Sequence, residues 1–191
     1  MKNLMQCALG DDWHKLPPAL QAHYRYGDLT EAGFMDIEFP WFMQPFLSVL
    51  RLFGALVNSR GKNVPTLVEK NYKNDTQHWK RTITYPNGKV IYFYSALVAA
   101  EENQLIEYTN SIMGLQMSVH VADGKLHYSG VRFVFKLGTI LLPIPEWLLL
   151  GHTTITETAV DETHFAMDFR LTHPLFGQIF RYAGSFKVDC A

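Results

Sequence analysis

Apolar and polar residues alternate with a period of two along most of the chain from residue 64 onward. The alternation is clearest in residues 76–85, which predicts a β-strand with two distinct faces. One face carries Trp79, Arg81, Ile83 and Tyr85. The Asn87-Gly88 pair that follows is typical of a tight hairpin turn, so residues 89–99 are expected to return alongside as the next strand.

Further segments of the same kind follow at short intervals. They cover residues 104–112, 114–122, 125–136, 153–160, 163–171 and 178–188. Successive strands joined by short turns form an antiparallel meander, and so many strands in one small domain curl until the sheet has no exposed edge. We therefore predict a mainly β (α+β) fold in which the meander closes into a lipocalin-like barrel or half-barrel of about eight to ten strands. A strongly curved open sheet that grips a helix is the alternative.

The beginning of the chain lacks this alternation. Residues 13–18 end in two prolines, which predicts a helix start because proline is tolerated in a first turn. The N-terminal helices are expected to cap or plug the barrel. The whole chain, residues 1–191, is thus expected to be one domain, with a helical segment at 1–63 and an antiparallel β-barrel or sheet at 64–191.

Residues 39–57 are almost wholly apolar, so they have to be tested as a membrane span. A spanning helix needs about 20 uninterrupted apolar residues. Here Pro40 and Pro45 interrupt the segment, and Arg51 lies within it. We predict instead a buried or half-buried helix over residues 45–57. The alternative is an amphipathic helix that lies on a membrane surface.

Composition narrows the function classes. Charged residues make up 18% of the 191 and aromatic residues 14%, a balance that favours a folded chain over a disordered one. The formal net charge is −1 and no run of Lys or Arg occurs, so no nucleic-acid partner is expected. Two cysteines, Cys7 and Cys190, are too few for a disulfide-framed secreted domain, and no signal peptide is visible. A cytoplasmic location is therefore expected.

The motifs of common enzyme and cofactor sites are missing from the sequence. It contains no Gly-x-Gly-x-x-Gly, no P-loop and no Gly-x-Ser-x-Gly elbow. The eight histidines are scattered, and none forms a His-x-x-x-His or His-Glu-x-x-His pair. We expect neither a metal site nor a cofactor, and we expect most of the histidines to lie on the surface.

Two charged residues interrupt the inward-facing apolar pattern. Arg81 shares a face with Trp79 and Ile83, and Glu157 shares one with Ile155. An isolated buried charge costs several kcal/mol, so each needs a partner or water. The simplest arrangement is an Arg81–Glu157 ion pair inside an apolar cavity, with Glu107 as a further member. Such a pair either orients strands only or holds the polar end of an apolar ligand.

The aromatic residues at period-two spacing allow the same two interpretations. Trp79, Tyr94 and Tyr182 are candidates for the wall of a ligand cavity, together with Arg81 and Glu157. Aromatic side chains of this kind also fill ordinary protein cores. In a barrel one inner face serves both purposes.

Short motifs in a fixed order resemble the family of domain of unknown function 4166 (DUF4166). The motifs are Trp13-x-x-Leu16-Pro17-Pro18, His23-Tyr24, Gly33, Val64-Pro65, Trp79-x-Arg81, Leu142-Pro143-x-Pro145, Glu157 and Tyr182-x-Gly184. The resemblance extends over nearly the whole chain. Members of that family are bacterial, and some are fused to nucleotide-binding, dehydrogenase-like domains. The resemblance implies a fold and a ligand-binding role.

Three functions remain open from the sequence. The first is a module that binds a hydrophobic or amphipathic small molecule, which requires an elongated, aromatic-lined cavity that reaches solvent. The second is an enzyme, such as an isomerase or cyclase, that uses Glu157 or Glu107 as acid or base. The third is a subunit that docks on a membrane surface or a protein partner through the segment from Phe39 to Val57, which requires an exposed apolar patch there and a filled barrel.

Overall fold

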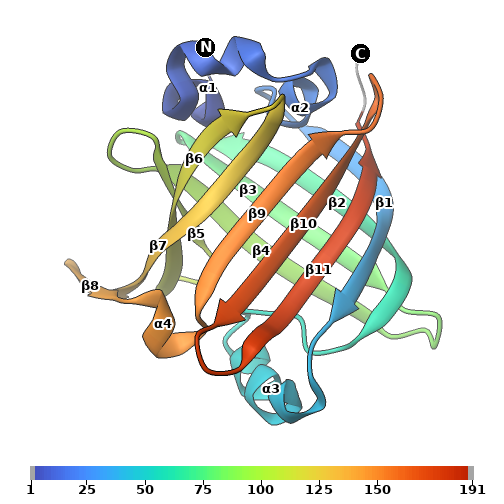
Figure 1. The fold of residues 1–191 in the computed structure, drawn as a ribbon, viewed down its shortest axis with the longest axis vertical. Coiled ribbons are helices and arrows are strands. Elements are labelled where there is room, and N and C mark those ends of the chain that lie inside the picture. The colour runs from blue at the N-terminus through green and yellow to red at the C-terminus, as the bar shows by residue number, and fades with distance from the viewer. Residues whose placement is uncertain (1–2, 189–191) are drawn as a thin grey trace.

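The computed structural model describes residues 3–188, and its main feature is a barrel of antiparallel strands (Figure 1). The strands are β1 (Leu29–Glu38), β2 (Gly61–Lys73), β3 (Thr76–Thr84), β4 (Val90–Ala99), β5 (Gln104–Tyr108), β6 (Met113–Ala122), β7 (Lys125–Leu137), β8 (Ile140–Ile144), β9 (His152–Ala159), β10 (His164–His173) and β11 (Gly177–Lys187). They pair in the order β6-β5-β4-β3-β2-β1-β11-β10-β9-β7-β8, and a further pairing of β6 with β7 closes the ring. The predicted lipocalin-like barrel is therefore confirmed, with β8 as an added edge strand on β7.

Short helices lie at the two ends of the barrel. They are α1 (Leu4–Leu9), η1 (Gly10–Lys15), α2 (Pro18–His23), η2 (Trp41–Met43), α3 (Gln44–Leu52) and α4 (Glu146–Leu149), where η denotes a 3₁₀-helix. α1 and α2 cover one end, which we call the capped end, as predicted for the N-terminal helices (Figure 1). α3 and α4 lie at the opposite end, which we call the mouth.

The inner face of the barrel carries the alternating apolar residues that the sequence indicates. The most deeply buried side chains include Phe165, Phe180, Phe186, Leu105, Met117 and Leu126. Of the turns, Asp123 and Gly124 both have positive φ, as a tight two-residue hairpin requires. The period-two faces predicted for β10 and β11 are confirmed, because Phe165, Leu171 and Phe180 all point inward.

The N-terminal segment differs from the prediction, because residues 29–38 form strand β1 instead of helix or loop. β1 pairs with β2 on one side and with β11 on the other. Gly33 permits the second pairing, since a Cβ at this position would lie 2.1 Å from the carbonyl oxygen of Ser185. Leu29, Met35 and Ile37 alternate toward the core, so the pattern extends to this part of the chain too.

The apolar segment at residues 39–57 forms a shorter helix than predicted. α3 begins with Pro45 in its first turn and stops at Leu52, before Gly54, which has a φ of +71°. Only Leu47 of this helix is fully buried. None of the helices within residues 3–188 has the length and apolar character needed to cross a membrane.

Strand β7 changes partner along its length at Gly130. It pairs with β9 before this residue and with β8 after it. A Cβ on Gly130 would lie 1.8 Å from Oε1 of Glu146, so the glycine makes room for that carboxylate. Glu146 accepts a hydrogen bond from the backbone N–H of Thr153 at 3.1 Å and lies 2.8 Å from Nδ1 of His152. Gly130 therefore allows the sheet to branch at this point.

The ladder between β4 and β5 is the shortest in the ring. It pairs four residues of β4, from Ala96 to Ala99, with Leu105 to Tyr108. Nearer the mouth, Arg51 of α3 donates a hydrogen bond to the carbonyl oxygen of Tyr92 at 2.8 Å. The last turn of α3 therefore covers the edge of β4 where β5 does not.

Candidate functional site

Five of the six residues predicted to bind a ligand line one internal space of about 30 Å³ near the middle of the barrel. They are Trp79, Arg81, Glu107, Glu157 and Tyr182. Each occupies an inward position of its strand, where the neighbouring residues along the strand point outward. The structure thus brings these side chains together, and their role in binding stays a prediction.

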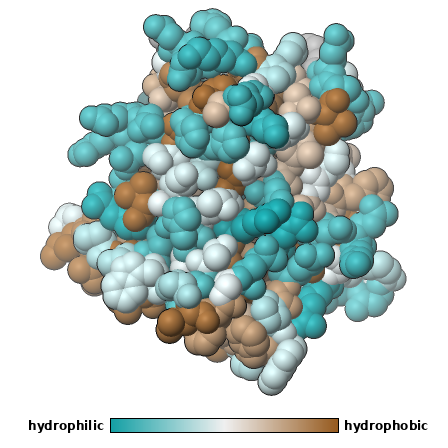
Figure 2. Space-filling model, in the orientation of Figure 1, coloured by the Kyte–Doolittle hydropathy of each residue, from teal (hydrophilic) through white to brown (hydrophobic). Residues whose placement is uncertain are grey.

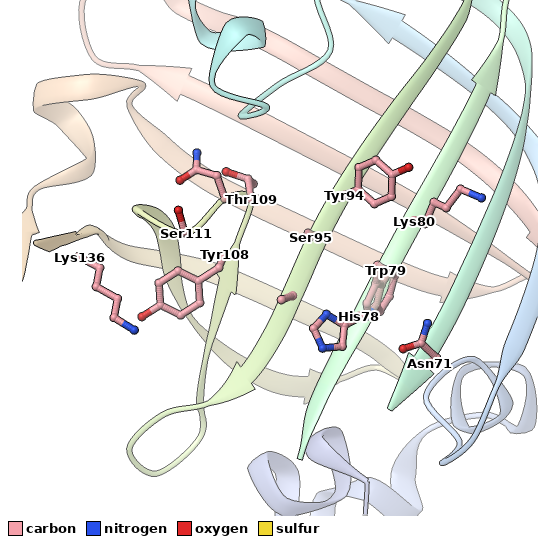
Figure 3. Close-up of a pocket in the computed structure, with 12 residues that line it drawn as sticks. Asn71, His78, Trp79, Lys80, Tyr94, Ser95, Tyr108, Thr109, Ser111 and Lys136 are labelled. Atoms are coloured by element: carbon pink, nitrogen blue, oxygen red, sulfur yellow. The ribbon is translucent and has the colours of Figure 1, made fainter. Parts of the chain in front are cut away.

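Tyr94 lies elsewhere, and its predicted place in the cavity wall is wrong. The inward positions of β4 are Ile91, Phe93 and Ser95, so Tyr94 points outward and is 56% exposed. It lines a groove of about 590 Å³ on the outside of β3, β4 and β5, which also contains Lys80 (Figure 3). Because the sequence of β4 is apolar on both faces, its alternation does not show which face points into the barrel.

Arg81 forms an ion pair with a different carboxylate from the one predicted. Its Nη2 lies 3.4 Å from Oε1 of Glu107, and its Nη1 donates to Oγ of Ser95 at 2.9 Å. The guanidinium carbon lies 4.8 Å from the ring centroid of Trp79 and 5.4 Å from that of Phe93. Two aromatic faces and one carboxylate therefore hold this cation in the interior.

Glu157 is held by phenols instead of by Arg81. The hydroxyl of Tyr24 donates to its carboxylate, with oxygen distances of 2.7 and 2.9 Å. The hydroxyl of Tyr128 bonds to that of Tyr24 in turn, and Nε2 of His23 lies 3.8 Å from Oε1 of Glu157. Burial raises the pKa of the Glu157 carboxyl above its ordinary value, although His23 and Tyr24 oppose the shift. The predicted Arg81–Glu157 ion pair is therefore wrong. Arg81 pairs with Glu107, Glu157 bonds to Tyr24, and all four side chains line the same 30 Å³ space.

A second charged group lies behind Glu157 toward the capped end. Lys70 Nζ lies 2.8 Å from Oε1 of Glu31 and donates to the carbonyl oxygen of His23 at 2.8 Å. Nδ1 of His23 also lies 2.8 Å from Oε1 of Glu31. We call Lys70, Glu31 and His23 the buried triad, and none of them is more than 2% exposed.

In the buried triad, the neighbouring charges outweigh the effect of burial on the pKa of Glu31 but not on the pKa of Lys70. Burial alone would raise the pKa of Glu31, but His23 and Lys70 outweigh it and hold this pKa at about 2. Burial lowers the pKa of Lys70 to about 8, although Glu31 counteracts the shift. Glu31 is therefore ionised at neutral pH, and Lys70 titrates not far above it.

Sequence reasoning missed the buried triad, although the signal was present. In β2, Lys70 continues the inward series of Val64, Thr66 and Val68. In β1, Glu31 continues the series of inward residues that includes Met35, but the strand itself was not recognised. His23 is an exception to the prediction that most histidines lie on the surface, because α2 places it in the interior at the capped end, where it is 2% exposed.

The interior holds less open space than an elongated ligand cavity needs. Beside the 30 Å³ space lies a second one of about 50 Å³, which shares Glu107 and Tyr182 with it. Beyond that, at the mouth, lies an apolar pocket of about 520 Å³ between α3, α4 and the β5–β6 turn. It shares Met113, Phe133 and Leu150 with the 50 Å³ space. The three spaces form a series from the surface to Arg81, and only the outermost, which we call the mouth pocket, has the size of a ligand.

The inner end of the series has hydrogen-bonding capacity to spare. Nε1 of Trp79 is buried and has no acceptor within residues 3–188. Unpaired buried donors of this kind are uncommon and indicate a place for a ligand atom or an ordered water. Within the same residues, no group of three or more His, Cys, Asp or Glu is placed to hold a metal ion. The arrangement is suited to holding a polar group and to moving a proton along Tyr128, Tyr24 and Glu157.

The family model described as "Domain of unknown function (DUF4166)" matches residues 16–186. This range includes every residue that lines the 30 Å³ space and all three residues of the buried triad. No curated protein matches the chain.

Proposed function

Because this chain belongs to the DUF4166 family, whose description assigns no activity, we propose a function from its geometry: the barrel binds an apolar small molecule with an uncharged polar head. The apolar part occupies the mouth pocket, and the head points inward toward Arg81 and Glu107. One observation carries the proposal. The 520 Å³ mouth pocket has the volume of a typical small-molecule site and continues through shared side chains to a set of convergent polar groups.

The lining of the mouth pocket supports an apolar ligand. Its wall is formed mainly by aliphatic and aromatic side chains, among them Phe46, Leu50, Phe53, Phe133, Phe135 and Leu149. Burying such surface against a ligand stabilises the complex by roughly 25 cal/mol for each Å² removed from water. A hydrocarbon chain or ring system therefore gains most of its affinity here.

The charges at the inner end favour an uncharged head. Arg81 is already paired with Glu107, so a ligand carboxylate would have to compete with a protein carboxylate. A hydroxyl or carbonyl group needs no such exchange, because Ser95 and Nε1 of Trp79 offer hydrogen bonds without a net charge.

Displacement of a neutral fluorescent probe tests the proposal. N-phenyl-1-naphthylamine should bind the protein with enhanced emission, and 1-decanol should displace it at lower concentration than decanoate does. Met113→Trp fills the junction between the mouth pocket and the inner space, so it should weaken probe binding by about tenfold or more, equivalent to about 1.4 kcal/mol. Val160→Trp, at an exposed residue of the capped end, is the matched control and should leave binding unchanged.

A second variant tests the direction of the ligand. Glu107→Gln frees Arg81 from its carboxylate, so the preference should shift from decanol toward decanoate. Unaltered probe binding in Met113→Trp, or an unaltered preference in Glu107→Gln, would contradict the proposed position of the ligand.

An enzyme that uses Glu157 as acid or base is the second candidate. It is favoured by the raised pKa of this carboxyl and by the phenols that connect to it. The space beside Glu157 has room for only about one water molecule, so a substrate would need the barrel to widen. Binding without chemistry therefore stands first, and recovery of a chemically altered ligand from the protein would reverse that order.

A further inference from the structure

Exposed apolar side chains gather at the mouth of the barrel. We call six of them the apolar ring: Trp41, Leu52, Phe53, Ile140, Trp147 and Leu175, each between 62 and 83% exposed. They come from four separate parts of the chain, namely the β1–β2 connection, the β7–β8 hairpin, α4 and the β10–β11 turn. Figure 2 shows hydrophobic residues over the α3 and α4 end, whereas hydrophilic residues predominate over the N-terminal helices.

Basic residues lie at the same end of the barrel as the apolar ring. They are Arg51, Arg60, Lys62, Lys89 and Lys136, from connections and strand ends at the mouth. Within residues 3–188 none of the five has a carboxylate at ion-pair distance. The carboxylates at this end are engaged elsewhere: Glu146 is buried against Gly130 and bonds to His152, and at the end of β1 Glu38 pairs with Arg181 and Asp36 accepts a hydrogen bond from the backbone N–H of Asn63. The mouth therefore presents unpaired positive charge around apolar tips.

Acidic residues outnumber basic ones at the capped end, where Lys15, Arg25, Lys73, Lys125 and Lys187 also lie. The strand connections there carry Asp75, Glu101, Glu102, Asp123, Asp161 and Glu162, and η1 adds Asp11 and Asp12. A net charge of −1 for the whole chain conceals this separation of charge between the two ends. Such a molecule approaches a negatively charged surface with its mouth foremost.

We propose that the mouth docks on an anionic lipid bilayer, with the apolar ring inserted among the acyl chains and the five cations at the headgroups. Scattered loop tips of Trp, Phe and Leu suit the irregular interior of a bilayer, and tryptophan favours the headgroup boundary. Basic residues near an anionic surface strengthen binding to it. The inference goes beyond the proposed function, since docking would stand even if the mouth pocket held nothing.

The position of the mouth pocket gives docking a consequence. Leu52 and Phe53 belong both to the apolar ring and to the pocket wall. The pocket therefore borders the apolar ring at these two residues, and a docked barrel would exchange an apolar molecule with the bilayer without passing it through water.

Vesicle binding tests this inference through the tryptophans of the protein itself. Trp41 and Trp147 are exposed members of the ring, whereas Trp13 and Trp79 are buried. Vesicles of equimolar phosphatidylcholine and phosphatidylglycerol should shift the emission to the blue and sediment with the protein. Vesicles of phosphatidylcholine alone should bind at least tenfold more weakly, and 0.5 M NaCl should reduce binding to the anionic vesicles.

Paired variants assign the binding to the mouth. Leu52→Ser with Leu175→Ser removes two exposed side chains, and Lys89→Glu with Lys136→Glu reverses two charges, so each pair should reduce binding at least tenfold. The controls at the capped end, Val160→Ser and Lys125→Glu, should not. All four variants alter exposed residues, and circular dichroism checks that they remain folded.

Three outcomes would overturn docking on a bilayer. One is failure of the wild-type protein to bind anionic vesicles, and another is binding that the mouth variants leave unchanged. The third is sedimentation as a dimer that Leu52→Ser and Leu175→Ser convert to a monomer without any binding to vesicles, which would assign the ring to self-association. Probe displacement by decanol is measured without lipid, so it reports on the pocket independently of these results.

Discussion

Lys70 Nζ lies 2.8 Å from Oε1 of Glu31 in a region where neither side chain is more than 2% exposed. Both charges lost their hydration when the barrel formed, and the ion pair has to compensate for that loss. His23 joins them through its backbone carbonyl and its ring, so α2 is bonded to strands β1 and β2 through polar groups. The capped end is therefore held by charged hydrogen bonds in addition to apolar packing.

Removal of the negative charge from the buried triad should destabilise the protein. Glu31→Gln leaves Lys70 buried without its carboxylate partner, and breaking a buried ion pair from one side costs about 3–5 kcal/mol of unfolding free energy at pH 7. The pKa of Glu31 lies at about 2 in the folded protein, below its ordinary 4.5. Its contribution is therefore complete above pH 4.5 and is lost as the pH falls toward 2. Urea titrations from pH 7 to pH 3 should show the wild type and the variant converging.

A double variant separates the ion pair from general disruption. Glu31→Gln combined with Lys70→Met removes both charges, so its loss of stability should be smaller than the sum of the two single losses. Additive losses would show that the two groups do not interact in solution.

Stability should respond to alkaline pH through Lys70. Burial lowers its pKa to about 8 from the ordinary 10.5, so between these values the unfolded chain binds more protons than the folded one. The contribution of Lys70 to the unfolding free energy therefore increases with pH across this window. Lys70→Met lacks that increase. The difference between wild type and variant, measured by urea unfolding at pH 7.5 and pH 10, should change accordingly; a constant difference would contradict the lowered pKa.

Glu157 should have the opposite effect on the acid side. Because burial raises its folded pKa above 4.5, the folded protein binds the extra proton and gains stability at low pH, which it loses as the pH rises above 4.5. Glu157→Gln removes this dependence. Relative to the wild type, the variant should become more stable between pH 4 and pH 7, as urea denaturation would measure. A variant whose relative stability falls over this range would show that Glu157 is ionised with a lowered pKa.

The branch of β7 offers a test of packing alone. Gly130→Ala would bring a methyl group against the carboxylate of Glu146, at a cost of about 1–3 kcal/mol of unfolding free energy. Glu146→Ala in the same chain removes the obstacle, so it should recover part of the loss, although the N–H of Thr153 then lacks its acceptor. Thermal unfolding of the two single variants and the double variant measures this. Equal melting temperatures for Gly130→Ala and the wild type would show that the carboxylate moves aside freely.

The period-two pattern predicted the barrel and the inward faces of most strands. It also identified Trp79, Arg81, Glu157 and Tyr182 as interior residues, because each interrupts or continues an apolar series within its own strand. Tyr94 escaped this logic, since β4 is apolar on both faces and the pattern does not say which face is inside.

Partners across the barrel were beyond the sequence pattern. Arg81 on β3 and Glu157 on β9 are separated in the strand order, so their alternation says that both point inward but not at which height they meet. Glu107 lies on β5, only two strands from β3, and it forms the ion pair with Arg81 instead. The buried triad was missed for a simpler reason, because β1 lies in the part of the chain that the pattern assigned to helix and loop.

The four residue pairs that join β4 to β5 contrast with the ten that join β6 to β7. A barrel with one short ladder separates first at that ladder. Separation of β4 from β5 would break the hydrogen bond between Arg51 and Tyr92 and leave the longer ladders intact. The diameter of the barrel at the mouth is then adjustable, whereas the depth of the accessible space is fixed by Arg81 and Glu107 in the interior. Ligands would then be distinguished by their length and by the chemistry of their polar heads, and ligands of different width would be tolerated.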